Sequence, residues 1–336
     1  MSFVLNLNIV LILWGGVLSL FHELNNITPN NIEMKIHLFD NPELNNRIQT
    51  GYTAIANYND GFIATGTDGR IDWISITGKI TRSEKISGFR FNCLLTNDQF
   101  IIAAGDHGNV AISAKNQPFQ KIESGTDKNI NSITLFDEFV IAGTDDGELL
   151  LGDPDGFFQI IRLNVKGNIT SFSSNKTDCY GVTDEGEIMH SKDGLNWNIS
   201  DFNQEYNGFY KACSFKKVLL TDNRIAVIGI HTDGSPAVLF SSQGNVWTER
   251  SLNYTDDQGR DGYLEIAPND IIYDDFTDQF YLSCNNGKLM TLPSCTHCNE
   301  LWAISSEGLD LTGISISEDK MIIVGENYFI QSFTLS

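Results

Sequence analysis

The segment from Phe139 to Gly152 reads FVIAGTDDGELLLG, and its pattern decides the fold. Val, Ile, Phe and Leu on both sides of the centre favour β-strands. The Asp146-Gly147 pair in the middle supplies the positive φ angles that a tight hairpin turn requires. The segment therefore predicts a β-hairpin.

The same pattern recurs along the whole chain, with copies that begin at Phe62, Phe100, Phe139, Cys179, Ile225, Phe280 and Met321. The steps between copies are 38, 39, 40, 46, 55 and 41 residues, and the last copy has lost its Gly turn. A strand-like run precedes each hairpin and a more polar strand follows it. Four strands in about 40 residues is the period of a propeller blade.

These repeats predict an all-β fold, a seven-bladed β-propeller of four-stranded antiparallel blades, with six or eight blades as the alternatives. The chain ends after the third strand of the last copy, and the segment Met34 to Phe39 lies before the first strand of the first copy. We predict that this segment pairs as the fourth strand of the last blade. Such closure would remove an open sheet edge and tie the ring.

An apolar run of about 13 residues, Ile9 to Phe21, suits a secretory signal and is short for a membrane span of roughly 20 residues. We predict a signal peptide over residues 1–22, a single propeller domain over residues 23–336, and a secreted, extracellular protein. A buried N-terminal element and an uncleaved anchor are the alternatives.

The net charge is -21, from 22 basic and 43 acidic residues, and this argues against nucleic acid and an anionic membrane surface as partners. Six cysteines in a secreted chain predict structural disulfides. Free buried thiols and a metal site near Cys295 and Cys298 are the alternatives. Five Asn-x-Ser/Thr sequons are compatible with a glycoprotein, although chance gives about as many at this composition.

A second motif lies one strand after the Gly turns. It reads SKDGLNW from Ser191 to Trp197 and SSQGNVW from Ser241 to Trp247, with weaker copies at Ser75, Ser113 and Asp153. These segments resemble the Asp-box, or BNR repeat, of sialidase-like, sortilin-like and photosystem-assembly-factor-like propellers.

In that family the Asp-box is a structural turn between the third and fourth strands, and the second copy here departs from it with Gln243 in place of Asp. The resemblance does not imply sialidase activity, which needs an arginine cluster, whereas this chain has only eight scattered Arg. It implies structural roles for Ser191, Asp193, Gly194, Trp197, Ser241, Gly244 and Trp247.

Two steps of the repeat are long, and the extra residues fall at 201–210 and 250–270, which we predict to be between-blade loops that flank blade five. Long loops on a rigid scaffold often carry function. The first insertion offers aromatic rings for a sugar or peptide, or rings that fold inward to cover the blade. These rings are Phe202, Tyr206, Phe209 and Tyr210.

The second insertion carries paired acids, which suit Ca²⁺ or general acid and base work, with a solvated acidic loop as the alternative. Its candidate residues are Asp256, Asp257, Arg260, Asp261 and Tyr263. No other cofactor is predicted and no catalytic residue is assigned.

The function predicted from these features is binding, without catalysis, of a glycan or an extracellular protein through loops on one face. The alternatives are a glycan-active hydrolase or lyase with paired carboxylates on that face, and a structural component of an extracellular assembly. The oligomeric state stays open. The acids of the hairpin turns predict an anionic face: Asp68, Asp106, Asp145, Asp146, Asp184, Glu185 and Asp233.

Overall fold

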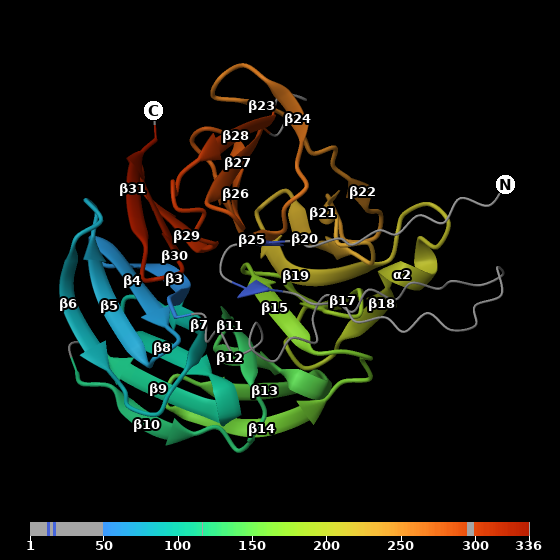
Figure 1. Ribbon diagram of the computed structural model, residues 1–336. Coiled ribbons are helices and arrows are strands. Elements are labelled where there is room, and N and C mark those ends of the chain that lie inside the picture. The colour runs from blue at the N-terminus through green and yellow to red at the C-terminus, as the bar shows by residue number, and fades with distance from the viewer. Residues whose placement is uncertain (1–11, 14–15, 18–49, 116, 294–298, 336) are drawn as a thin grey trace, which may run out of the picture. The chain divides into compact units, whose positions relative to one another are not determined.

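The computed structural model in Figure 1 describes residues 12–13, 16–17, 50–115, 117–293 and 299–335. The chain divides into two compact units, 1–48 and 49–336. In the first unit the described residues form a small hairpin of β1 (Ile12–Leu13) and β2 (Gly16–Val17). The predicted closing strand and most of the predicted signal peptide lie outside the described residues, so both stay predictions.

The second unit confirms the predicted seven-bladed β-propeller, with small antiparallel sheets arranged in a ring (Figure 1). Blade one consists of β3 (Tyr52–Tyr58), β4 (Gly61–Gly66), β5 (Arg70–Ser75) and β6 (Ile80–Lys85). Blade two consists of β7 (Phe91–Thr96), β8 (Phe100–Gly105), β9 (Asn109–Ala114) and β10 (Gln120–Glu123). Blade three consists of β11 (Ile130–Phe136), β12 (Phe139–Thr144), β13 (Glu148–Asp153) and β14 (Gly156–Arg162).

The next three blades follow the same order. Blade four consists of β15 (Ile169–Ser174), β16 (Cys179–Thr183), β17 (Glu187–Ser191) and β18 (Asn198–Asp201). Blade five consists of β19 (Cys213–Leu220), β20 (Ile225–His231), β21 (Pro236–Ser241) and the short β22 (Thr248–Glu249). Blade six consists of β25 (Pro268–Asp274), β26 (Gln279–Cys284), β27 (Lys288–Pro293) and β28 (Asn299–Ala303).

Among the described residues blade seven has three strands, β29 (Leu311–Ser317), β30 (Lys320–Gly325) and β31 (Ile330–Thr334). Blade seven meets blade one directly. Thr312 Oγ1 donates to the carbonyl of Tyr52 at 2.6 Å, and Asn57 Nδ2 donates to the carbonyl of Ile316 at 2.5 Å. These bonds join the last blade to the first within the described part of the chain.

The second insertion differs from the predicted loop because much of it is a hairpin. It forms β23 (Asn253–Asp256) and β24 (Asp261–Tyr263), and β23 pairs in parallel with β28. The hairpin therefore adds two strands to the outer edge of blade six. The first insertion contains one helical turn, α2 (Phe202–Glu205).

The turns between the second and third strands have the predicted positive φ angles. In blade three, the short 3₁₀ turn η2 (Asp145–Gly147) places Asp146 at φ 54° and Gly147 at φ 70°. A similar turn, η1 (Asp106–Gly108), serves blade two. In blade seven, which has no Gly there, Asn327 and Tyr328 adopt φ 54° and 57°. These residues bear the strain that Gly would avoid.

Each innermost strand contains a β-bulge near its beginning. The extra residue is the second residue of the strand in six blades and the fourth residue in blade five. All seven bulged residues are polar: Thr53, Asn92, Asn131, Thr170, Lys216, Asn269 and Thr312. We call this set the bulge ring.

The bulge ring links successive blades. Asn131 Nδ2 donates to the carbonyl of Ile169 in blade four at 3.2 Å. Four other members donate to a backbone carbonyl of the following blade at 2.6 to 3.3 Å, namely Asn92, Thr170, Asn269 and Thr312. Lys216 instead donates to the side-chain oxygen of Asn269, and Thr53 bonds to Thr65 of its own blade.

The hydrophobic core lies between neighbouring blades. Ile102 and Ala104 of blade two, for example, pack with Val140 and Ala142 of blade three. Four cysteines occupy this core as free buried thiols, Cys93, Cys179, Cys213 and Cys284, so the predicted disulfides do not form among them. They stand in four different blades. Cys295 and Cys298 lie outside the described residues. No helix within the described ranges is both long and apolar enough for a membrane span.

Candidate functional site

Antiparallel blades place two kinds of connection on the same side of the ring: the turns between second and third strands, and the segments between blades. We call this side the insertion face, because both insertions begin there. The turns between first and second strands, and between third and fourth strands, lie on the opposite face.

The first insertion is held by a helix cap and an aromatic stack. The side chain of Asp201 accepts a hydrogen bond from Gln204 N at 3.0 Å, as an N-cap of α2. Phe202 is 1% exposed and packs between blades four and five. The half-buried Tyr206 and Tyr210 stack on it, with ring centroids 4.7 and 6.0 Å away. These three predicted site residues therefore cover the core.

Phe209, the fourth aromatic residue of the first insertion, points into solvent. Phe209 is 83% exposed, although the turn that carries it begins at the half-buried Tyr206. Phe209 N donates to the carbonyl of Tyr206 at 3.0 Å, so the ring stands on a backbone fixed by the stack. The exposed ring lies two residues from Lys211 in the same segment, so it can contribute to a surface that also contains charged groups.

The acids of the second insertion bind their own hairpin. Asp256 Oδ1 accepts from the backbone N–H groups of Gln258 and Arg260, and Asp256 Oδ2 pairs with the Arg260 guanidinium at 2.7 Å. The hydrogen bond from the backbone N–H of Arg260 is the main reason that the pKa of Asp256 is lowered. Asp261 accepts from Thr255 Oγ1 at 2.8 Å, and Asp257 is exposed. Turn formation accounts for the Asp256–Arg260 pair.

The structure brings the two insertions together above blade five. Lys211, at the end of the first insertion, pairs with Asp233 of the β20–β21 turn at 2.5 Å. Tyr263, at the end of β24, is 46% exposed, and its pKa is raised by burial and by the charge of Glu249, with Lys211 and Asp233 also within electrostatic reach. We call Phe209, Lys211, Asp233 and Tyr263 the blade-five patch.

The turn from Ser191 to Trp197 is organised by Asp193 on the opposite face. Asp193 Oδ1 accepts from the backbone N–H groups of Leu195 and Asn196 at 2.9 and 2.7 Å. These bonds, led by that of Asn196, hold the pKa of Asp193 far below its usual range. Trp197 Nε1 donates to the carbonyl of Gly194, and its ring lies 5.4 Å from that of Phe172.

The turn from Ser241 to Trp247 has a related geometry without the Asp. Ser241 Oγ accepts from Gly244 N at 2.8 Å. The indole of Trp247 is 4% exposed between blades four and five, and Trp247 N donates to Tyr206 Oη at 2.9 Å. The first insertion is thus fastened to this turn by a hydrogen bond.

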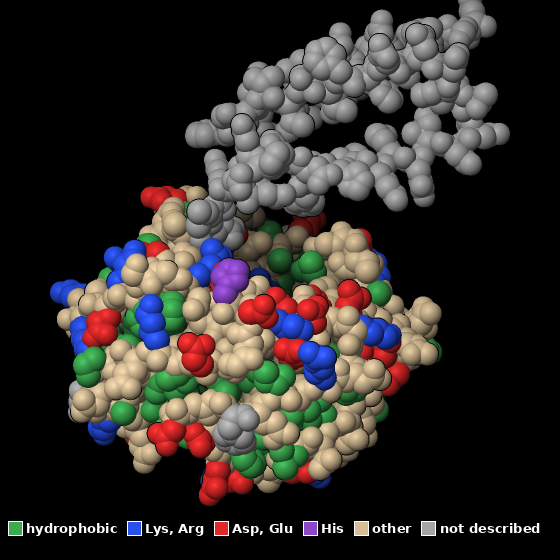
Figure 2. Space-filling model, turned by 90° about the horizontal axis from the view of Figure 1, so that it is seen from below, with side chains coloured by type: hydrophobic (Ala, Val, Ile, Leu, Met, Phe, Trp, Pro, Cys, Tyr) green, Lys and Arg blue, Asp and Glu red, His purple; other side chains and the backbone are tan. Residues whose placement is uncertain are grey.

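Most acids of the predicted anionic face have a nearby basic or amide partner. Asp68 pairs with Lys85 at 2.7 Å and Asp106 with Arg90 at 3.4 Å. On the rim of the ring, which Figure 2 draws, acidic and basic side chains are likewise interspersed. Some partners come from the segments between blades, such as Arg90, and others from strand ends, such as Lys85. Because each pair neutralises part of the charge locally, the turns supply less of the net charge than their composition suggests.

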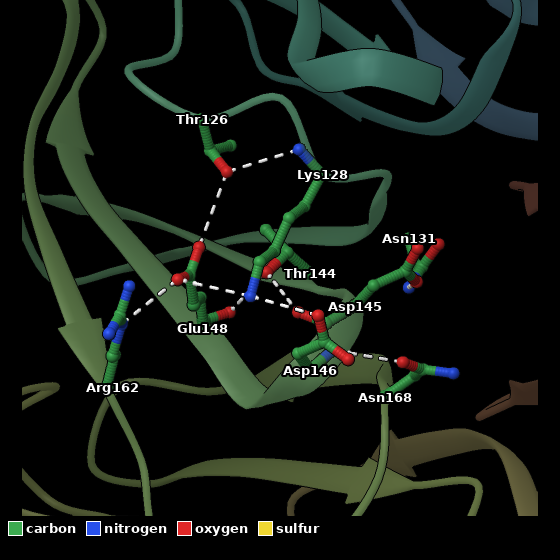
Figure 3. Close-up of polar contacts among 9 residues, drawn as sticks. All are labelled: Thr126, Lys128, Asn131, Thr144, Asp145, Asp146, Glu148, Arg162 and Asn168. Atoms are coloured by element: carbon green, nitrogen blue, oxygen red, sulfur yellow. Dashed lines mark hydrogen bonds and ion pairs between the residues drawn. The ribbon is translucent and has the colours of Figure 1, made fainter.

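Figure 3 shows the most extensive of these networks, at the junction of blades two, three and four. Lys128 Nζ lies between Asp146 and Glu148, 3.2 Å from an oxygen of each. The Glu148 side chain is only 5% exposed and also pairs with Arg162 at 3.2 Å. Two cations and the hydroxyl of Thr126 thus compensate one buried carboxylate.

A cysteine, a histidine and a glutamate form a chain of contacts under the blade-five patch. Cys213 Sγ lies 3.3 Å from His231 Nδ1, and His231 Nε2 lies 2.8 Å from Glu249 Oε1. Such an order can activate a thiol, but only an accessible thiolate is a nucleophile. Cys213 is 3% exposed, and burial, followed by the charge of Glu249, raises its pKa to about 12. The contacts therefore hold the short strand β22, which contains Glu249, against β20, which contains His231.

The central channel opens on the insertion face into a cavity of about 630 Å³. All seven innermost strands line it, and three cations do so as well: Arg90, Lys216 and Lys217. The hairpin repeats do not point to these residues. The innermost strands carry a sequence signal for Lys216, because it occupies the bulge position, which is polar in every blade. Within the described ranges, no group of three or more His, Cys, Asp or Glu residues is placed to hold a metal ion.

No protein-family model matches the chain, and no curated protein matches it. Among solved structures, the chain is similar to the crystal structure of the computationally designed Ika8 protein, with a TM-score of 0.60 and 11% sequence identity. The match covers 85% of this chain and 97% of that one. At this identity the likeness shows the fold alone. The class defined by fold and site is therefore a β-propeller.

Proposed function

We propose that the protein is a secreted, non-catalytic binding propeller that recognises a glycan or an extracellular protein through its insertion face. The blade-five patch carries the proposal. It joins residues from both insertions, and Phe209 is 83% exposed at its edge. An apolar ring beside the Lys211–Asp233 pair and the Tyr263 hydroxyl offers a flat face together with hydrogen-bonding groups, which suits sugars and peptides.

The insertion acids favour binding over glycoside hydrolysis. A general acid for that reaction needs a carboxyl group with a raised pKa. Asp256 has a lowered pKa, mainly because the backbone N–H of Arg260 bonds to it. The pKa of Asp201 is also lowered, because bonds from Lys166 and Gln204 outweigh the effect of burial. Both groups therefore favour the carboxylate form.

We further propose that the Ser191–Trp197 and Ser241–Trp247 turns are Asp-box elements with a structural role. The two backbone bonds to Asp193 and the packed Trp197 and Trp247 support this reading. Two of the predicted sequon residues, Asn198 and Asn253, are exposed and accessible to a glycan. By contrast, Asn168 uses its amide to bind Asp184 at 2.7 Å. Glycopeptide mapping of the secreted protein tests this part of the proposal.

A glycan and peptide array probed with the purified protein tests the binding role, and each positive ligand is then titrated by calorimetry. The test variant is Phe209→Ser. The matched control is Phe276→Ser, because Phe276 is 86% exposed in the β25–β26 turn on the opposite face. We expect Phe209→Ser to weaken binding at least tenfold and Phe276→Ser to leave it unchanged.

Equal effects of the two substitutions would contradict the assignment of the insertion face. Release of a shortened glycan during the titration would contradict the non-catalytic role. Neither substitution opens the core, since both side chains stand in solvent, so the folded state is preserved for the comparison.

A further inference from the structure

The cavity at the mouth of the central channel has a charge opposite to that of the whole protein. The chain carries 43 acidic and 22 basic residues. The cavity lining, however, contains three cations, Arg90, Lys216 and Lys217, and one acid, Asp270. Arg90 directly precedes β7 of blade two, whereas Lys216 and Lys217 belong to β19 of blade five, and β7 and β19 lie on different sides of the ring (Figure 1).

The single acid of the lining is already engaged by the protein. Asp270 Oδ1 pairs with Lys217 at 3.1 Å and accepts from Ile271 N at 3.0 Å. Its Oδ2 accepts from Ile314 N of blade seven at 3.1 Å. Asp270 therefore serves as a joint between blades six and seven, and it compensates one of the three cations.

Lys216 differs from the other two cations. Arg90 pairs with Asp106, 3.4 Å away, and Lys217 pairs with Asp270. The hydrogen bond of Lys216 Nζ goes to a neutral group, the amide oxygen of Asn269. Lys216 is exposed to the cavity, and the protein around its ammonium removes part of its hydration, which lowers its pKa. The positive charge of Lys217 also lowers the pKa, whereas Asp270 and Asp310 raise it. An ammonium in this position gains from a further anionic partner.

The cavity also has a graded lining. The bulge ring surrounds its mouth with polar groups. Two residues after each bulge residue, the strand contributes an apolar residue to the lining in at least four blades. These apolar residues are Ile55, Leu94, Ile133 and Ile271. A ligand that fits both parts carries an anionic head and a compact apolar body. The volume of about 630 Å³ lies in the range of small-molecule sites.

We propose that the mouth of the central channel binds a small organic oxyanion, a carboxylate or a phosphate monoester, with Lys216, Lys217 and Arg90 around the anionic group. The site is separate from the blade-five patch, and the proposal does not depend on the function proposed for that patch. Among the described residues the hydrogen bond of Lys216 goes to a neutral amide, and the anion supplies a charged partner in direct contact. The apolar body of the ligand lies against the isoleucine and leucine side chains below.

Isothermal titration calorimetry of the full chain with phenyl phosphate, benzoate and inorganic phosphate tests the proposal, at constant ionic strength set with sodium chloride. We expect saturable binding of phenyl phosphate or benzoate, with inorganic phosphate weaker because it lacks the apolar part. The two aromatic probes distinguish the phosphate from the carboxylate form of the ligand. Absence of saturable binding by all three would refute the proposal.

The variants Lys216→Met and Arg90→Gln locate the binding. Each should weaken it by about tenfold or more, the usual effect of removing one charge-assisted hydrogen bond. Arg82→Gln is the control, because Arg82 has an exposure similar to that of Arg90 and lies on β6, the outer strand of blade one, with its guanidinium over the ring of Trp73. If Lys216→Met fails to fold, the affinity of Arg90→Gln tests the site instead. Arg90 lies outside the bulge ring, so its substitution leaves the inter-blade bonds of the ring in place. Equal affinities in Arg90→Gln and Arg82→Gln would overturn the site.

Discussion

The bulge ring predicts that one buried amide contributes strongly to the closure of the propeller. Asn269 is 7% exposed. Its Nδ2 donates to the carbonyl of Leu311 at 2.9 Å and to Asn285 Oδ1 at 2.6 Å, and its Oδ1 accepts from Lys216. The substitution Asn269→Ala removes all three bonds at the junction of blades five, six and seven.

The magnitude follows from the groups that lose their partner. Leu311 is fully buried, and an orphaned buried polar group costs about 1 to 3 kcal/mol. Water in the channel can reach Lys216 but reaches the Leu311 carbonyl less well. We therefore expect Asn269→Ala to lower the free energy of unfolding by about 2 to 4 kcal/mol.

The matched control is Thr53→Ala. Thr53 occupies the same bulge in blade one, but its hydroxyl bonds to the carbonyl of Thr65 in its own blade at 3.1 Å. Its loss should cost about 1 kcal/mol. Equilibrium urea unfolding, followed by tryptophan fluorescence and by circular dichroism, measures both variants. Free energies of unfolding within about 0.5 kcal/mol of each other would refute the idea that the inter-blade bonds of the ring matter, since that is the usual scatter of such comparisons.

Three further predictions concern other parts of the chain. Asp193→Ala should lower thermal stability at pH 7, and the difference from the unsubstituted protein should shrink below about pH 4. The folded pKa of Asp193 is depressed by its backbone bonds, so protonation removes the same contribution; a difference that stays constant with pH would contradict this. Cys93, Cys213 and Cys284 should resist iodoacetamide at pH 8 in the native state and react after denaturation, as read by peptide mass mapping, because burial raises the pKa of each thiol to about 12; native labelling of all three would contradict their burial. Ile36→Pro in the predicted closing strand should speed amide hydrogen exchange in β31, with Asn45→Pro as the control, and equal exchange rates in the two variants would refute the predicted pairing.

The repeat made the propeller predictable from sequence. Each blade carries its own hairpin chemistry, such as Asp146-Gly147, so the local signal is repeated seven times and a weak copy is supported by the others. Even the copy without Gly forms its turn, because Asn327 and Tyr328 adopt the left-handed conformation. Turns of this kind can be predicted from sequence, since the residues that form them are neighbours in the chain.

The details of the insertions depended on distant contacts, which the sequence alone does not reveal. Phe202 and Phe209 are the same residue type seven positions apart, yet one is buried and the other is 83% exposed. The difference arises because Phe202 meets Phe215 of blade five. The Asn253–Tyr263 hairpin likewise became part of blade six only through its parallel pairing with β28.

The cysteines illustrate the same limit. Their number and the predicted compartment favoured disulfides, but pairing requires Cα atoms within about 7 Å. The four described cysteines stand in strands of four different blades and fill the core. Cys93 lies inside β7, Cys179 and Cys213 begin β16 and β19, and Cys284 ends β26. Their repeated placement in the blades serves packing, a use of cysteine that composition does not distinguish from cross-linking.

The distribution of charge sharpens the meaning of the net charge of -21. Lys85, at the end of β6, and Lys128 and Lys211, in segments between blades, pair with acids of neighbouring turns. Lys216 and Lys217 line the cavity at the mouth of the channel. These five cations therefore lie on or near the insertion face. Screening over about 8 Å at physiological salt weakens the field of the distant surface acids, whereas charges inside the channel act at short range. The channel mouth can thus attract an anion although the protein as a whole carries a large negative charge.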